Sequence, residues 1–113
     1  VHLSQQDFEN AEKDFTRVIE INDAAGKPQS IAVYEGRGAA RGRLKDKPGA
    51  IADMTEAIAL DPKAALNYKF RGLLYLNSDN EAAALKDLQK ARELYKAEGI
   101  EDDQVELVLA SLE

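Results

Sequence analysis

The sequence contains no cysteine, and its only histidine is His2, close to the amino terminus. Without cysteine the chain can form neither a disulfide framework nor a thiolate metal site. One histidine and no thiol also leave no nucleophile–base pair of the kind that supports covalent catalysis. The sequence therefore predicts a protein that is not an enzyme and that holds no cofactor or metal.

Long apolar runs are also missing. No stretch approaches the roughly 18 apolar residues that a membrane-spanning helix needs, and no signal peptide is visible. The formal charge is −6, from 15 basic and 21 acidic residues, which argues against nucleic acid or an anionic membrane as the main partner. The compartment stays open, with the cytoplasm favoured. A sequence that begins at Val1 without methionine can be a fragment or a processed form.

An internal repeat organises what is present. Like residues stand 34 positions apart, namely Tyr34 and Tyr68, Gly38 and Gly72, Ala50 and Ala84, and Asp53 and Asp87. A fixed period of this length indicates one supersecondary unit that is copied along the chain. With 113 residues and 44% hydrophobic content, the copies are expected to form one domain with its own core.

The copied units are predicted to be helical. Apolar residues recur at three- and four-residue steps over 7–22 and again after 102, which is the period of an amphipathic helix. Cap and stop signals place further helices at about 30–44, 46–60, 63–76 and 81–97. The candidate N-caps are Asp7, Ser30 and Asp46, and Gly99 is the candidate stop of the helix at 81–97. No stretch alternates with period two for long enough to form a strand.

This pattern resembles the tetratricopeptide repeat, a helix–turn–helix unit of 34 residues. The matching residues at 31–64 are Tyr34, Gly38, Ala50, Met54, Ala57 and Pro62. Those at 65–98 are Tyr68, Gly72, Tyr75, Ala84, Leu88 and Ala91. Arg37 and Arg71 stand where the family pattern has an apolar residue. Upstream, Ala11, Phe15 and Val18 fit only the second helix of a further unit.

The resemblance implies an all-α solenoid of antiparallel helix pairs, with about 2.5 repeats and a C-terminal capping helix. The expected parts of this single domain are a partial repeat at 1–25, repeats at 31–64 and 65–98, and the capping helix at 101–113. Because Ala11 precedes Ala50 by 39 residues rather than 34, a lengthened loop is expected around Gly26 and Pro28. Glycine at Gly38 and Gly72 is expected where two helices approach closely.

The resemblance also implies a non-catalytic scaffold whose first helices line a concave groove for a peptide or helix of a partner protein. The groove positions are Glu35, Ala39, Gly42 and Arg43 in one unit, and Leu66, Lys69, Leu73, Leu76 and Asn77 in the next. An apolar strip on the second set needs a covering group. Two alternatives stay open, a bound partner segment or cover by the terminal helix or a second copy.

Self-association is the alternative function. The partial first repeat lacks most of one helix, so Phe8, Phe15 and Val18 are expected to be partly uncovered. An open solenoid end of this kind favours a homo-oligomer.

The charged residues have structural and functional interpretations. Basic residues cluster at 35–47, where Arg37, Arg41, Arg43, Lys45 and Lys47 outnumber the acids. Because Arg71 repeats the Arg37 position, we expect Arg37 to pair with a repeat carboxylate such as Asp53, and Asp14 to hold an equivalent place. Arg43 and Lys45 are not repeated and are freer to bind an acidic partner. The run 36–42 looks like a dinucleotide fingerprint but lacks the strand that this motif requires, so helix packing is the better interpretation.

Overall fold

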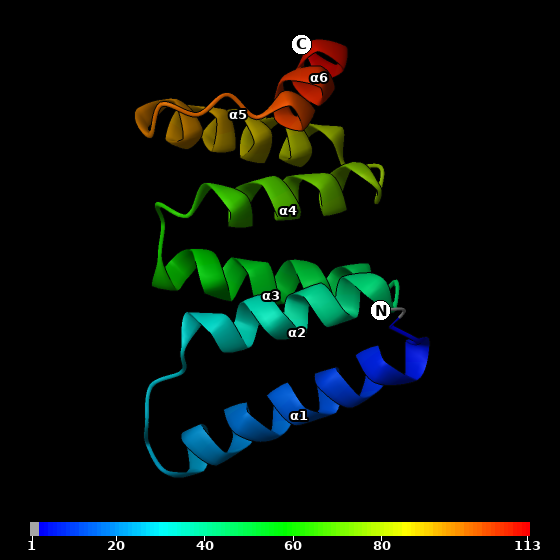
Figure 1. Ribbon diagram of the computed structural model, residues 1–113, viewed down its shortest axis with the longest axis vertical. Coiled ribbons are helices and arrows are strands. Elements are labelled where there is room, and N and C mark those ends of the chain that lie inside the picture. Colours follow the sequence, from blue (N-terminus) through cyan, green and yellow to red (C-terminus); the bar gives the residue numbers. More distant parts are fainter. Residues whose placement is uncertain (1–2) are drawn as a thin grey trace. The chain divides into compact units, whose positions relative to one another are not determined.

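The computed structural model describes residues 3–113, and these residues form six helices (Figure 1). The helices are α1 (Gln5–Ala24), α2 (Ile31–Arg43), α3 (Lys47–Leu60), α4 (Ala65–Leu76), α5 (Glu81–Ala97) and α6 (Asp103–Leu112). No residue within 3–113 lies in a strand. The prediction of an all-α helical repeat fold is therefore confirmed.

The chain divides into two compact units, Val1–Leu60 and Asp61–Glu113. In the first unit α1 packs against α2 and α2 against α3, and in the second α4 packs against α5 and α5 against α6. Figure 1 shows α2 and α3, and likewise α4 and α5, as antiparallel pairs joined by short turns. The repeat boundaries expected at 31–64 and 65–98 stay a prediction.

Short polar side chains start the helices of the first unit. The Ser4 hydroxyl accepts a hydrogen bond from the backbone N–H of Asp7 (3.3 Å), and the Asp7 carboxylate accepts one from the N–H of Ser4 (2.9 Å). This reciprocal capping box satisfies two backbone donors. The prediction of Asp7 as the N-cap is wrong, because the box begins at Ser4 and α1 begins at Gln5. Ser30 and Asp46 do accept bonds from backbone N–H groups in the first turns of α2 and α3, as predicted.

The lengthened loop between α1 and α2 is also present. Its first residues turn at Gly26, whose φ of +69° lies in the left-handed region that favours glycine. Gln29 holds the loop against the preceding helix, because its Nε2 donates to the carbonyl of Ile19 (2.9 Å) and to the carboxylate of Asp23 (2.9 Å). The additional residues are therefore fixed to the end of α1.

In the second unit a side chain caps α5, and the predicted stop at Gly99 is present. Asn80 accepts a bond from the N–H of Ala83 (3.2 Å), and Gly99 ends α5 with a φ of +76°. The start of α4 differs from the prediction. The Asp61 side chain accepts from the N–H of Lys63 (3.1 Å) in a separate turn, and α4 itself begins only at Ala65.

Gly38 and Gly72 lie in matching environments. A Cβ atom on Gly38 would contact Met54 and lie 3.2 Å from Cβ of Asp53. A Cβ atom on Gly72 would lie 2.9 Å from Cγ of Leu88 and 3.2 Å from Cβ of Asp87. The missing side chain thus lets each first helix approach the second helix of its pair, as the repeat pattern predicts.

The apolar stripe of α6 covers the second unit, as expected. Val105 and Leu109 are buried in one cluster with Leu88 and Ala91 of α5. Val108 and Leu112 pack against the same cluster. The short terminal helix is therefore held by burial of apolar surface, the dominant favourable term in packing.

Replacing Gly72 by alanine tests the close helix approach. Alanine favours a helix by about 1 kcal/mol over glycine, but the added Cβ would press on Leu88 and Asp87. Overpacking of this kind costs about 1–3 kcal/mol, so we expect a net loss of stability in urea denaturation. Lys86→Ala, at an exposed position of α5, is the control and should change little. A more stable Gly72→Ala variant would contradict the proposed crossing.

Candidate functional site

Two arginine–aspartate pairs recur at the repeat period. Arg37 donates to both carboxylate oxygens of Asp53, at 3.0 and 2.8 Å. Arg71 donates to both oxygens of Asp87, at 2.7 and 2.8 Å. Bidentate pairs of this geometry are among the stronger hydrogen bonds in proteins. The prediction that Arg37 pairs with Asp53 is confirmed, and these arginines bind the second helix of their own pair.

A second arginine of α2 extends this network to α1. Arg41 donates to Glu12 of α1 (2.8 Å) and to Asp53 of α3 (3.2 Å), so one side chain connects three helices. Arg37 also donates to the Thr16 hydroxyl of α1 (3.2 Å). The hydrogen bond from Arg37 to Asp53 raises the pKa of the guanidinium. Asp14, at the repeat position of Asp53, is exposed, and Thr16 and Glu12 are the residues of α1 that contact these arginines.

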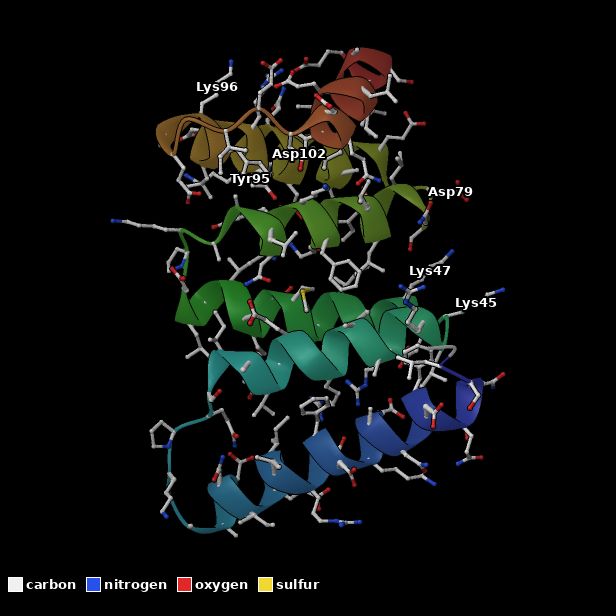
Figure 2. All side chains as sticks on the ribbon, viewed as in Figure 1. Lys45, Lys47, Asp79, Tyr95, Lys96 and Asp102 are labelled. Atoms are coloured by element: carbon white, nitrogen blue, oxygen red, sulfur yellow. The ribbon has the colours of Figure 1, made fainter. Side chains whose placement is uncertain are left out.

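Arg43 differs from these two arginines. Its guanidinium lies over the ring of Phe8, 6.0 Å from the ring centre, and no carboxylate within residues 3–113 forms an ion pair with it. Lys45 is exposed, and it extends outward from the turn between α2 and α3 (Figure 2). The basic cluster predicted at 35–47 therefore includes the paired, half-buried Arg37 and Arg41 and the exposed cations Arg43 and Lys45, while Lys47 is half-buried at the start of α3.

The four groove positions predicted on α2 differ in accessibility. Ala39 and Arg43, one turn apart, are both exposed, while Glu35 and Gly42 are half-buried. Ala39 and Arg43 also border a hollow of about 330 Å³ between α1 and α2. Its apolar lining includes Leu3, Phe8, Ala11 and Gly36. We call this feature the α1–α2 hollow.

Sequence reasoning missed the α1–α2 hollow. The signal that could have indicated it is Gly36, whose counterpart one repeat later is Phe70. A side chain on Gly36 would collide with the ring of Phe15. The unrepeated glycine therefore makes room for an aromatic ring of α1, and it leaves this part of α2 without a large side chain.

The groove positions predicted on α4 are partly taken by α6. Lys69 donates to the carboxylate of Asp102 (3.0 Å), which Figure 2 shows at the start of α6. Leu73 packs against the apolar cluster of α5 and α6. Leu66 is 64% exposed, Leu76 is half-buried and Asn77 is exposed. The sequence leaves two alternatives for the cover of these α4 positions, a partner segment, or the terminal helix or a second copy. The terminal helix covers Lys69 and Leu73.

Asp102 has two roles at this contact. Its side chain caps α6 by accepting a bond from the N–H of Val105 (3.0 Å), and it pairs with Lys69. The hydrogen bond from Val105 and the ammonium of Lys69 both lower the pKa of the Asp102 carboxyl, against the opposing effect of burial. The carboxylate is therefore held in its charged form, as the N-terminus of a helix also favours.

Comparisons with known proteins agree with this architecture. No family model matches the sequence. Over 97 residues the chain is 36% identical to the human protein "Tetratricopeptide repeat protein 13", an alignment that covers 83% of this chain and 11% of the relative. This likeness confirms the recognition of a tetratricopeptide repeat pattern in the chain. The chain spans 11% of the length of the human relative.

A solved structure of MamA shares the fold. The structures superpose with a TM-score of 0.57 at 17% sequence identity, covering 99% of this chain and 94% of the other. At this identity the likeness supports the fold alone. Likeness to a tetratricopeptide repeat protein points in general to a scaffold for protein–protein interaction, and such repeats are generally not enzymatic.

Metal, nucleotide and membrane sites each place specific requirements on the described residues. Among residues 3–113 no group of three histidine, cysteine or acidic side chains could hold a metal ion. His2 lies outside the described residues. The glycine-rich run 36–42 lies within α2, so it has helical rather than phosphate-loop geometry. None of the helices in the described part of the chain is long and apolar enough to cross a membrane.

Removing one partner of the repeated ion pair should be costly. Arg71→Met leaves the Asp87 carboxylate buried without its cation, and breaking a buried pair in this way costs about 3–5 kcal/mol. We expect a large loss of stability in urea denaturation. Replacing both groups, as in Arg71→Met with Asp87→Leu, should recover much of that loss, because no buried charge remains. Equal stability of the single variant and wild type would show that the pair contributes little.

Proposed function

We propose that the chain is a non-catalytic scaffold that binds a segment of another protein along the exposed faces of its first helices. The observation that carries the proposal is on α2. Ala39 and Arg43 share one exposed face, while Arg37 and Arg41 are engaged with Asp53. A face with an accessible cation and a small side chain suits close contact with a partner, since arginine is enriched at protein interfaces.

On α4 the proposed contact residues are fewer than the resemblance implies. Leu66, at 64% exposure, is the main apolar candidate, with Leu76 and Asn77 further along the helix. Lys69 and Leu73 contact the C-terminal part of the chain. We therefore propose that a partner contacts the ends of α4 more than its middle.

Peptide selection tests this function without a known partner. Binders selected from a random peptide library on the wild-type chain should weaken about tenfold or more on Ala39→Glu or Leu66→Glu, since burying an unpaired charge costs well over 1.4 kcal/mol. Both positions are exposed, so the variants should fold. Ala52→Glu on α3, also exposed, adds the same charge elsewhere and is the control. Selected peptides that bind the wild-type chain and all variants equally would show that the faces at Ala39 and Leu66 do not bind the partner.

A specific observation on α1 favours self-association as a second candidate. Val18 is 40% exposed, whereas Ala57 and Ala91, at the same position of the complete repeats, are fully buried. Ile21, one turn further along α1, is 60% exposed. Because the positions equivalent to Val18 are buried in the complete repeats and these two side chains of α1 are exposed, we propose that this face of α1 contacts a second copy of the chain.

Light scattering across a concentration series tests this second candidate. We expect the mass of the wild-type chain to rise with concentration, and Val18→Glu to abolish the rise because it places a charge in the apolar contact. Ala52→Glu again serves as the control with an equal change in charge. A wild-type chain that stays monomeric at every concentration would exclude self-association.

A further inference from the structure

The α1–α2 hollow combines an apolar floor with a cation at its edge. Phe8 and Ala11 of α1 and Ala39 of α2 form part of the lining. At about 330 Å³ the hollow is near the lower end of ligand pockets, which span about 300–1,000 Å³. That size suits one or two side chains of a peptide rather than an entire ligand.

Arg43 is the group that gives this hollow a charge preference. Its guanidinium lies over the Phe8 ring, which positions the planar group at the edge of the apolar lining. Arg37 and Arg41 are satisfied by Asp53 and Glu12, and no carboxylate in the described chain pairs with Arg43. Planar guanidinium groups match carboxylates in a bidentate geometry.

Charges of both signs border the hollow. Asp7 also lines the hollow, but its carboxylate accepts bonds from the N–H (2.9 Å) and hydroxyl (3.1 Å) of Ser4 in the capping box. Lys45 adds an exposed cation two positions beyond Arg43. Arg43 and Lys45 are therefore two exposed cations close together at the end of α2, on a chain whose formal charge is −6.

We propose that the α1–α2 hollow binds an acidic segment of a partner protein, with an apolar side chain in the hollow and a neighbouring carboxylate on Arg43. This inference rests on the proposed scaffold function and adds the chemistry of the partner. The apolar contact supplies the burial that favours association. The carboxylate supplies selectivity, because a neutral or basic segment leaves Arg43 without a partner.

A set of short fluorescein-labelled peptides tests the proposal on the intact chain. The probe alternates glutamate and leucine, one analogue has glutamine for each glutamate, and another has serine for each leucine. Fluorescence anisotropy should show the probe binding about tenfold more tightly than either analogue, because each analogue lacks one of the two contacts. Equal binding of the probe and the glutamine analogue would overturn the proposed charge preference.

Matched variants locate the binding. Arg43→Glu should weaken the probe about tenfold or more, while Arg17→Glu makes the same change in charge at an exposed position of α1 outside the hollow and should change little. Ala39→Leu should weaken the probe by filling the hollow, whereas Ala32→Leu, exposed elsewhere on α2, should not. Circular dichroism of each variant confirms that its helices remain. Loss of affinity in both charge variants, or in neither, would overturn the assignment to Arg43.

The outcome also separates this proposal from the scaffold function. If library-selected peptides still depend on Leu66 and Ala39 but the acidic probe does not bind, the chain is a scaffold and the assigned partner chemistry is wrong. If neither selected peptides nor the probe bind, both proposals fail.

Discussion

The structure depends on a buried carboxylate that recurs in each complete helix pair. Asp53 and Asp87 are almost fully buried, and a buried charge is tolerated only when it is paired and hydrogen-bonded. Each receives its arginine from the residue that precedes the crossing glycine, as in Arg37–Gly38. Because that glycine lies against Cβ of the aspartate, the close crossing and the ion pair occur at the same point of each helix pair. Together they fix how the first helix sits on the second.

This constraint also determines which charges stay available. Asp53 accepts hydrogen bonds from two arginines of α2, Arg37 and Arg41. Glu12 of α1 accepts a further hydrogen bond from Arg41. The basic cluster therefore contributes less positive field than its composition suggests. Arg43 lies beyond the reach of this network, at the C-terminal end of α2, where a cation is also favoured by the helix dipole. Its position explains why it is a better candidate for contact with a partner than its two neighbours.

The features that could be predicted from the sequence are those that are local or repeated. Ser30 and Asp46 act within one turn of their own helix, and the contacts of Gly38 return at Gly72, so each leaves a pattern in the sequence. The capping box at Ser4 was missed because two polar residues of one turn compete for the same role and both take part. The pairing of Lys69 with Asp102 joins residues 33 positions apart that have no repeated copy, so periodicity could not reveal it.

The same distinction between repeated and unrepeated residues indicates where function can reside in this chain. Repeated positions such as Arg37 and Arg71 hold the two helices of a pair together. A substitution there is therefore expected to lower the stability of the fold rather than to affect binding of a partner alone. Unrepeated positions are free of that requirement. Gly36 stands where the next repeat has Phe70, and the space that it leaves is filled by Phe15. Gly36 is therefore a departure from the repeat that serves packing. Arg43, whose counterpart one repeat later is Asn77, is instead an exposed departure at which a scaffold can acquire a preference for one partner without weakening its core.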